Sequence, residues 1–321
     1  MSETPAPYDA AAAPEAPAGA APVLRSWLFV PGDSERKQDK ALATQADAVI
    51  LDLEDSVAPE RLPRARECVS ALLRSRGCTA GPRLWVRVNA PDSGRLRADL
   101  EAVFAGGAPD GVVLPKVSAP AQIADVAQYV GSLETQASAR PGRTRLLVIT
   151  TETPAGVLAL PQYPAYLGHS RSLLARLAGL TWGAEDLGAA LGALERRDAS
   201  GVATFTFQLA RTSCLLAAAA LGVPAVDGVH TDFRDSQGLR RELDEARRDG
   251  FSGKLAIHPD QIASINAAFT PTEAERTQAQ RVVAAFAAAP GAGVVSLDGR
   301  MIDRPHLLQA QRILAAAQPG P

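Results

Sequence analysis

This chain of 321 residues has few cysteines, no long uninterrupted apolar run and no marked excess of charge of either sign. The length excludes a small disulfide scaffold, and the cysteines, Cys68, Cys78 and Cys214, are odd in number and lack metal-site spacing, which indicates reduced thiols in a cytoplasmic setting. The longest apolar run, residues 214–226, is interrupted by glycine and proline and is too short to cross a bilayer. The 33 basic and 35 acidic residues give a net charge of -2, so no global basic field exists for nucleic acid or an anionic membrane.

Nucleotide-binding motifs are also missing. Without a P-loop or a G-x-G-x-x-G motif, nucleotide hydrolysis and dinucleotide redox chemistry lack support. Residues 1–22 are rich in Ala and Pro and contain no Lys or Arg, so they match neither a signal peptide nor a transit peptide and are predicted to form a disordered tail. The whole chain, 46% hydrophobic and 21% charged, has the composition of a globular protein with a sizeable core.

Short β-branched runs alternate with segments of helical periodicity from residue 24 onward. Because eight such β/α units exceed what an open doubly wound sheet normally holds, we expect a (β/α)8 TIM barrel over residues 23–258. The expected strands are residues 26–30, 48–53, 84–88, 111–114, 145–150, 179–182, 225–229 and 254–257.

Polar side chains follow each expected strand at its carboxyl end. In a (β/α)8 barrel these ends meet on the face that carries the chemistry. A single charged residue there often only interacts with solvent in a loop. A polar residue at the carboxyl end of seven or eight strands is poorly explained in that way. The residues are Asp33; Asp52, Glu54 and Asp55; Arg87 and Asn89; Lys116; Glu152; Glu185 and Asp186; His230 and Asp232; and His258.

Residues 259–321 are predicted to form a mostly helical C-terminal extension. Residues 271–289 and 305–317 have helical patterns, with a turn at 291–293 and a short strand at 294–297 between them. Such an extension can cap its own barrel or reach a neighbouring subunit, and the pattern does not decide between these.

Glu152 and Asp186, at the ends of consecutive strands, form a candidate site for a hard divalent cation, since Mg²⁺ takes few protein carboxylates and keeps positions for water and substrate. Gly156 and Gly183 allow close backbone approach. The alternative for each carboxylate is a simple helix N-terminal charge.

Arg87 is expected to point into the barrel, where its guanidinium suits a carboxylate or a developing enolate oxygen. The alternative is a buried ion pair with Asp52, Glu54 and Asp55, and both can hold if these carboxylates orient the arginine. Glu185, beside Asp186, is assigned the same supporting role.

Arg36, Lys37 and Lys40 follow the first expected strand and could hold phosphates, although Arg36 and Lys40 also fit one solvated helix face. His230 and His258 lack zinc-site spacing, and a structural or substrate-contact role is favoured for both.

Eight motifs carry a resemblance to a known family: R-S-W-L-F-V-P-G, A-V-I-L-D-L-E-D-S-V-A-P, V-R-V-N, V-V-L-P-K, T-E-T-P-A-G, G-A-E-D-L-G, G-K-L-A-I-H-P and G-R-M-I-D-R-P-H. They span about residues 25–308. The chain is similar to the HpcH/HpaI aldolase and citrate lyase family, and more closely to its CitE-like branch of CoA-ester lyases, which includes citrate lyase beta subunit, malyl-CoA lyase and citramalyl-CoA lyase.

The resemblance implies a Mg²⁺-dependent lyase, with Mn²⁺ as an alternative metal, that splits a citramalyl-CoA or malyl-CoA type ester into a 2-oxo acid and acetyl-CoA. Glu152 and Asp186 match the metal ligands, and Arg87 matches the residue that stabilises developing charge. Residues matching substrate or CoA contacts are Phe29, Arg36, Lys40, Ile257 and His258.

Asp303 in the C-terminal extension matches a residue that enters the neighbouring protomer's site and serves as acid or base. The resemblance therefore implies a homo-oligomer, commonly a trimer. Two alternatives stay open: a citrate lyase beta-like subunit acting on a citryl acyl-carrier-protein thioester, and a non-catalytic CoA-binding protein. Residues 196–202, near the expected substrate, are polar and do not identify the acyl group.

Overall fold

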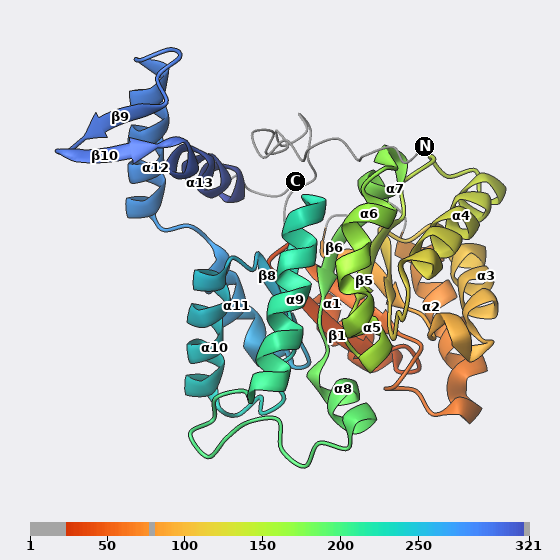
Figure 1. Cartoon of the computed structure of the whole chain (residues 1–321). Coiled ribbons are helices and arrows are strands. Elements are labelled where there is room, and N and C mark those ends of the chain that lie inside the picture. Colours follow the sequence, from red (N-terminus) through yellow and green to blue (C-terminus); the bar gives the residue numbers. More distant parts are fainter. Residues whose placement is uncertain (1–23, 77–80, 318–321) are drawn as a thin grey trace, which may run out of the picture.

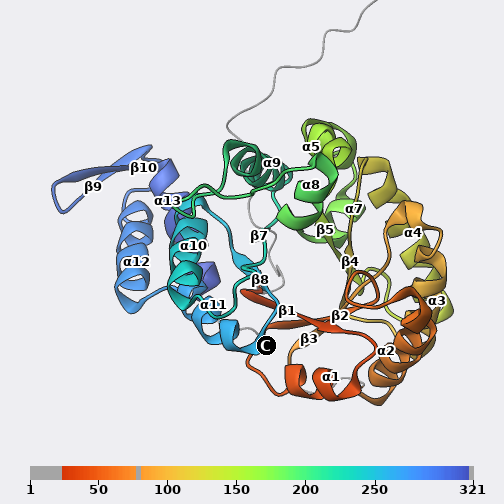
Figure 2. The same ribbon diagram turned by 90° about the horizontal axis from the view of Figure 1, so that it is seen from below.

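The computed structural model describes residues 24–76 and 81–317, and its central feature is a closed barrel of eight parallel strands (Figures 1 and 2). The tail expected over residues 1–22 lies outside the described residues, as does Cys78. The strands pair in chain order, and β1 closes the barrel against β8. They are β1 (Ser26–Pro31), β2 (Ala48–Asp52), β3 (Arg83–Arg87), β4 (Gly111–Leu114), β5 (Arg145–Ile149), β6 (Leu177–Thr181), β7 (Ala225–Asp227) and β8 (Gly253–Ala256).

Helices cover the outside of the barrel, as Figure 2 shows in a view along its axis, and the TIM-barrel prediction is confirmed. The α-helices of this layer are α1 (Glu35–Leu42), α2 (Leu62–Arg76), α3 (Leu96–Gly106), α4 (Pro120–Gln136), α5 (Pro154–Ala159), α6 (Tyr163–Leu167), α7 (Arg171–Arg176), α8 (Ala184–Leu191), α9 (Phe205–Leu221), α10 (Ser236–Asp249) and α11 (Ile262–Phe269). Short 3-10 helices are η1 (Pro59–Arg61), η2 (Pro91–Ser93), η3 (Leu160–Gln162) and η4 (Pro259–Gln261).

Two hydrophobic layers stabilise the barrel. The strands are apolar on both faces, as β2 shows with every residue buried, because one face packs on helices and the other fills the interior. Trp27 and Trp85 meet edge to face inside the barrel, with ring centroids 4.7 Å apart, among residues such as Ile50 and Leu255. The interior is therefore a packed core, and chemistry is confined to the carboxyl ends of the strands, here called the mouth of the barrel.

A helical arm follows the barrel. It consists of α12 (Glu273–Ala287), β9 (Val294–Leu297), β10 (Arg300–Asp303) and α13 (Arg304–Ala316), packed around a small core of their own that includes Val282 and Ile302. Figure 1 shows the arm standing to one side of the barrel. The sequence predicted the helices and β9 of this extension but missed β10, which pairs antiparallel with β9. No helix in the described ranges is long and apolar enough to cross a membrane.

Candidate active site

Arg87 ends β3 at the mouth and is held by carboxylates from β2 and the turn after it. Its Nε and Nη2 donate to the two carboxylate oxygens of Asp52, both at 2.7 Å, and its Nη1 lies 3.0 Å from Glu54 and 3.8 Å from Asp55. The ring of Phe29 lies 4.8 Å from the guanidinium carbon. A two-point pair with Asp52 fixes the plane of the guanidinium, so the arginine is preorganised before any ligand arrives.

Burial and neighbouring charges change the pKa values of Asp52 and Glu54. Burial alone would raise the pKa of Asp52, but Arg87 outweighs it and the pKa is lowered. For Glu54, burial prevails over Arg87 and Lys116 and raises the pKa to about 7. One oxygen of Glu54, Oε2, is buried and forms no hydrogen bond to a described residue, although Nη1 of Arg87 pairs with it at 3.0 Å.

Lys116 connects the Arg87 group to the next pair of carboxylates. Its Nζ contacts Glu54, lies 2.9 Å from Asp55 and lies 3.4 Å from Asp186. Its backbone N–H donates to Glu152 at 2.5 Å. The residue has a φ of 54°, the left-handed region that non-glycine residues seldom adopt, which is typical of a strained functional position. Although the sequence placed Lys116 at a strand end, it gave no reason to assign it to the site.

Glu152 and Asp186 both contact Lys116 and interact with each other electrostatically. Glu152 is only 4% exposed, and burial raises its pKa to about 8; Arg87 opposes this rise and the neighbouring Asp186 adds to it. Gly183 makes this approach possible, because a Cβ there would lie 2.7 Å from Cγ of Glu152. The negative charge of a buried carboxylate beside a second carboxylate is poorly balanced by protein groups alone.

The charged cluster, defined as Asp52, Glu54, Asp55, Arg87, Lys116, Glu152 and Asp186, fits a divalent cation. When all of its groups are ionised, five carboxylates face two cations. In the part of the chain that the structure describes, no three or more His, Cys, Asp or Glu side chains are arranged to hold a metal, so the cluster offers the two carboxylates of Glu152 and Asp186 rather than a full set of ligands. Two oxygen donors with open positions match a Mg²⁺ that completes its shell with water and substrate.

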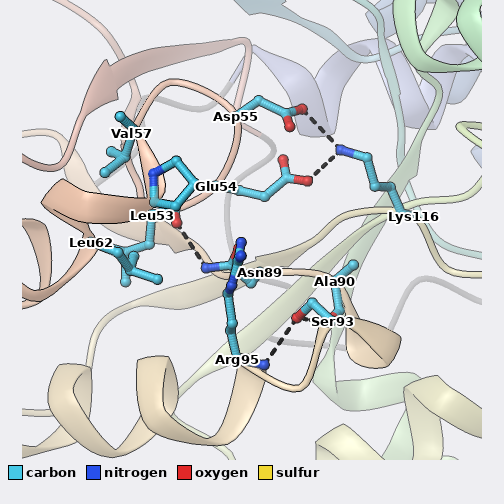
Figure 3. Close-up of a pocket in the computed structure, with 12 residues that line it drawn as sticks. Leu53, Glu54, Asp55, Val57, Leu62, Asn89, Ala90, Ser93, Arg95 and Lys116 are labelled. Atoms are coloured by element: carbon cyan, nitrogen blue, oxygen red, sulfur yellow. Dashed lines mark hydrogen bonds and ion pairs between the residues drawn. The ribbon is translucent and has the colours of Figure 1, made fainter.

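A pocket of about 390 Å³ opens beside the charged cluster (Figure 3). Lys116 reaches across it to Glu54 and Asp55, while Leu53, Val57 and other apolar residues line the opposite side. The pocket therefore offers room for a ligand next to charged groups, with apolar surface for its non-reacting part.

Three other residues predicted at the mouth have different surroundings. Glu185 does not join the cluster, since its carboxylate forms an exposed pair with Arg196 at 2.8 Å. Asn89 is buried and donates to Asp99 and to the Leu53 carbonyl, a structural arrangement. His230 contacts Glu242 at 2.9 Å.

A second ionic network lies between the barrel wall and helices α9 and α10. Lys254, 2% exposed, lies 2.9 Å from Asp227 and 3.0 Å from Glu242. Arg211 donates to Asp227 at 3.0 Å, and Trp182 does so at 2.7 Å. Burial acts to raise the pKa of Asp227, but Lys254 and Arg211 lower it to about 2. This network ties β7 and β8 to the helix layer.

The predicted CoA contacts gather at one sector of the rim. Arg36 and Lys40 are exposed on α1, and neither forms an ion pair with a carboxylate in the described ranges. Ile257 and His258 follow β8, the strand that pairs with β1. Phe29 lies on β1 itself, against Arg87.

Asp303 lies in the arm and far along the chain from these residues. It ends β10 and precedes α13, where its carboxylate contacts His306 at 2.5 Å, and this hydrogen bond lowers its pKa. Figures 1 and 2 show β10 to one side of the barrel and α8, which carries Asp186, in another part of the molecule. The structure does not bring Asp303 to the charged cluster of its own chain.

Comparison with known proteins agrees with the motifs. The family model described as HpcH/HpaI aldolase/citrate lyase matches residues 25–259. A (3S)-malyl-CoA thioesterase of Cereibacter sphaeroides is 38% identical over 92% of this chain and 95% of its own length. The mitochondrial citramalyl-CoA lyase of Rattus norvegicus is 34% identical over 91% of this chain and 86% of its own.

The fold also matches solved structures. A crystal structure of CitE from Mycobacterium tuberculosis in complex with magnesium, acetoacetate and coenzyme A has a TM-score of 0.69 and 34% identity, covering 93% of this chain and 98% of that chain. Family model, relatives and structure all span the barrel that holds the charged cluster. The chain therefore belongs to the HpcH/HpaI aldolase/citrate lyase family and is an enzyme of that family, as its motifs predicted.

Proposed function

We propose that the protein is a Mg²⁺-dependent carbon-carbon lyase that cleaves a citramalyl-CoA or malyl-CoA type ester into a 2-oxo acid and acetyl-CoA. The observation that carries the proposal is the pairing of Glu152 and Asp186 with a preorganised Arg87 in one cluster. Relatives named as acting on malyl-CoA and citramalyl-CoA, and a related structure with magnesium and coenzyme A, support the same assignment.

Glu152 and Asp186 hold the metal, and Mn²⁺ is an alternative ion for these oxygen ligands. The bound ion supplies Lewis-acid chemistry for oxygen atoms of the substrate. Lys116 holds both carboxylates in place, through its N–H to Glu152 and its Nζ near Asp186. A fixed pair of carboxylates needs little rearrangement when the ligand arrives.

Arg87 acts where charge develops. When the bond between the hydroxyl-bearing carbon and the acetyl carbon breaks, its electron pair passes to the thioester as an enolate. The hydroxyl gives its proton to a water molecule as it becomes the carbonyl of the 2-oxo acid. A guanidinium held by Asp52 is suited to bind that enolate oxygen, because its donors are oriented in advance.

Asp303 of a neighbouring protomer serves as the acid that protonates the acetyl carbon, or as the base in the reverse direction. This assignment makes the protein a homo-oligomer, and the family resemblance favours a trimer. Its support is the position of Asp303 on an arm that stands beside the barrel, with its motif matching the family's C-terminal aspartate.

Assays of citramalyl-CoA and malyl-CoA with and without Mg²⁺ test the proposal. We expect a 2-oxo acid and acetyl-CoA in equal amounts, only with the metal. Asp186→Asn abolishes turnover, whereas Asp125→Asn, a matched change at an exposed aspartate on α4, leaves it unchanged. Absence of cleavage of either ester, or full activity of Asp186→Asn, contradicts the proposal.

Hydrolysis of the thioester is a second candidate, favoured by the 38% identity to a relative named a malyl-CoA thioesterase. The two reactions differ in their products. Hydrolysis releases a free thiol and a hydroxy acid, while carbon-carbon cleavage releases a 2-oxo acid and keeps the thioester intact. Measuring thiol and 2-oxo acid in the same reaction assigns each turnover to one of them.

A further inference from the structure

The helix that carries Asp186 is short and has little buried surface. Helix α8 has eight residues, of which only Leu187 and Gly188 are buried, and its first turn, which contains Asp186, is partly exposed. Figure 1 shows α8 and the segment after it at the lower edge of the barrel, past the end of α9. A metal ligand on a helix with so few buried residues needs further contacts to keep its position.

The segment between α8 and α9 contains a small hairpin, defined as residues 196–204. The N–H of Asp198 donates to the carbonyl of Val202 at 2.8 Å. The N–H of Thr204 donates to the carbonyl of Arg196 at 3.0 Å. The Asp198 carboxylate accepts a further hydrogen bond from the N–H of Val202 at 3.0 Å. Because these bonds close the hairpin on itself, it can act as one rigid connection.

Arg196, at one end of the hairpin, lies along α8. Its guanidinium pairs at 2.8 Å with Glu185, the residue before Asp186. A Cβ on Gly188 would lie 3.3 Å from Cδ of Arg196, so the stem of the arginine rests on the helix where it has no side chain. Glu185, which does not join the charged cluster, is therefore the point at which the hairpin contacts the turn that holds Asp186.

Arg197, the next residue, contacts α10. Its Nη1 donates to the carbonyl of Gly201 at 2.8 Å, within the hairpin, and its Nη2 contacts Glu242. Glu242 also lies 3.0 Å from Nζ of Lys254 and 2.9 Å from Nδ1 of His230. Burial acts to raise the pKa of Glu242, but these three partners lower it to about 2, so the carboxylate is charged at neutral pH. The hairpin is thus bound to a charged group of the second ionic network.

We propose that Arg196 and Arg197 form a tether that positions Asp186 for the metal, by joining α8 to the second ionic network through the hairpin. Each arginine acts on Asp186 through another residue, so both are positioning residues. The inference rests on the proposed function, because it assigns residues that support the metal site of that reaction. Since the two ion pairs lie in series, breaking either one releases α8 from α10.

Manganese binding to the full chain, followed by electron paramagnetic resonance, tests the tether without requiring turnover. We expect Arg196→Gln and Arg197→Gln each to weaken Mn²⁺ binding about fivefold, equivalent to about 1 kcal/mol and near the upper limit for an ion pair at the surface. The double variant should weaken binding by the same factor, because the first change already breaks the series. Two independent ion pairs would instead combine to a loss of about 25-fold.

Hydrogen exchange of the α8 amides, measured on the same variants without metal, gives a second readout. Exchange in α8 should be faster in each variant, while exchange of the β2 amides, which lie in a fully buried strand, should stay the same.

Two further variants serve as controls. Arg197→Lys keeps a cation that can reach Glu242, and it should bind Mn²⁺ within about twofold of the wild type. Arg240→Gln removes an exposed arginine of α10 that pairs with no carboxylate in the described ranges, and it should change neither measurement. Together they separate the tether from a general effect of removing a surface charge.

Two results overturn the tether: unchanged Mn²⁺ affinity or unchanged α8 exchange in the single variants, or a double variant whose loss equals the product of the single losses. Failure of the proposed function looks different. A wild type that cleaves no ester, but whose variants show faster α8 exchange and the same weakened Mn²⁺ binding, keeps the tether and loses the lyase assignment. A wild type that cleaves the ester while both single variants bind Mn²⁺ normally does the reverse.

Discussion

Co-expression of Asp186→Asn and Asp303→Asn chains measures whether one active site takes residues from two protomers. Asp186 lies on α8 at the mouth of the barrel, and Asp303 ends β10 in the arm, so each variant damages a different part of its chain. If the arm enters the neighbour's mouth, a working site needs an intact barrel from one protomer and an intact arm from the next. Each variant alone is then inactive, because every site in its homo-oligomer lacks one residue.

The recovered activity follows from the geometry of a closed ring. With equal expression and random assembly, half of the barrels and half of the arms are intact, so about one quarter of the sites are complete. Among trimers that contain both chains, about one site in three is complete, whichever chain is in the majority. Two different affinity tags isolate these mixed trimers, and the assay is the Mg²⁺-dependent release of 2-oxo acid per site.

A matched pair gives the control. Arg87→Lys and Asp186→Asn both alter the barrel, so their co-expression leaves every site with one damaged barrel and restores no activity. Mixed oligomers of the first pair that stay as inactive as their parents refute the composite site, and full activity of Asp303→Asn alone refutes any role for that carboxylate.

Three further predictions concern single residues. Gly183→Ala places a Cβ 2.7 Å from Cγ of Glu152, so kcat/KM should fall about 100-fold. Gly131→Ala is the control, because its nearest contact would be 3.7 Å away, and it should leave kcat/KM unchanged. Equal kcat/KM values for the two variants would contradict the close approach. Arg87→Lys keeps the charge but loses the two-point pair with Asp52. Steady-state kinetics should show kcat lowered roughly 100- to 1,000-fold with a smaller change in KM. A kcat within tenfold of the wild-type value would refute this. Asp227, with its pKa lowered from 3.8 to about 2, contributes roughly 2 kcal/mol that is present above pH 4 and lost as the pH falls through 2. Urea unfolding of Asp227→Asn should show a smaller free energy of unfolding at pH 7 and a shallower loss in acid, and identical pH profiles would contradict that contribution.

The barrel was predictable because its strands are apolar on both faces. Residues 111–114 were predicted as a strand with the bounds that the structure shows, since a short β-branched run between helical segments has few other structures available. The start of β6 was missed at Leu177, where Leu and Ala continue the helical composition of α7. Composition of this kind cannot separate a helix end from a buried strand.

β10 escaped prediction for a different reason. It has four residues, two of them exposed, and it exists because it pairs with β9. A local signal was present in the Asp-Gly pair between the strands: Asp298 and Gly299 have φ values of 53° and 74°, the geometry of a tight hairpin turn that Asp-Gly favours. Reading that pair would have located the strand that ends at Asp303.

The site was predictable residue by residue but not as a cluster. Motif position identified Glu152, Asp186 and Arg87, yet nothing local indicates that Lys116 contacts residues 62 and 36 positions away in the chain. The same limit explains Glu185, which neighbours Asp186 in sequence but turns to Arg196. Adjacent residues at the start of a helix face different directions, and only the folded barrel determines which one faces the mouth.

Negative charge lies inside the mouth of the barrel and positive charge lies at its rim. This arrangement matters because a net charge of -2 provides no long-range attraction for an anionic ligand. Inside, the five carboxylates outnumber the two cations when all are ionised, which favours a metal and repels phosphates. At the rim, α1 and Arg234 present positive charge without carboxylate partners in the described ranges. A coenzyme A ester carries its phosphates at one end and its reacting carbons at the other, so this gradient admits it in one orientation. Orientation by local charge, rather than attraction by global charge, is therefore the electrostatic contribution of this fold to the proposed reaction.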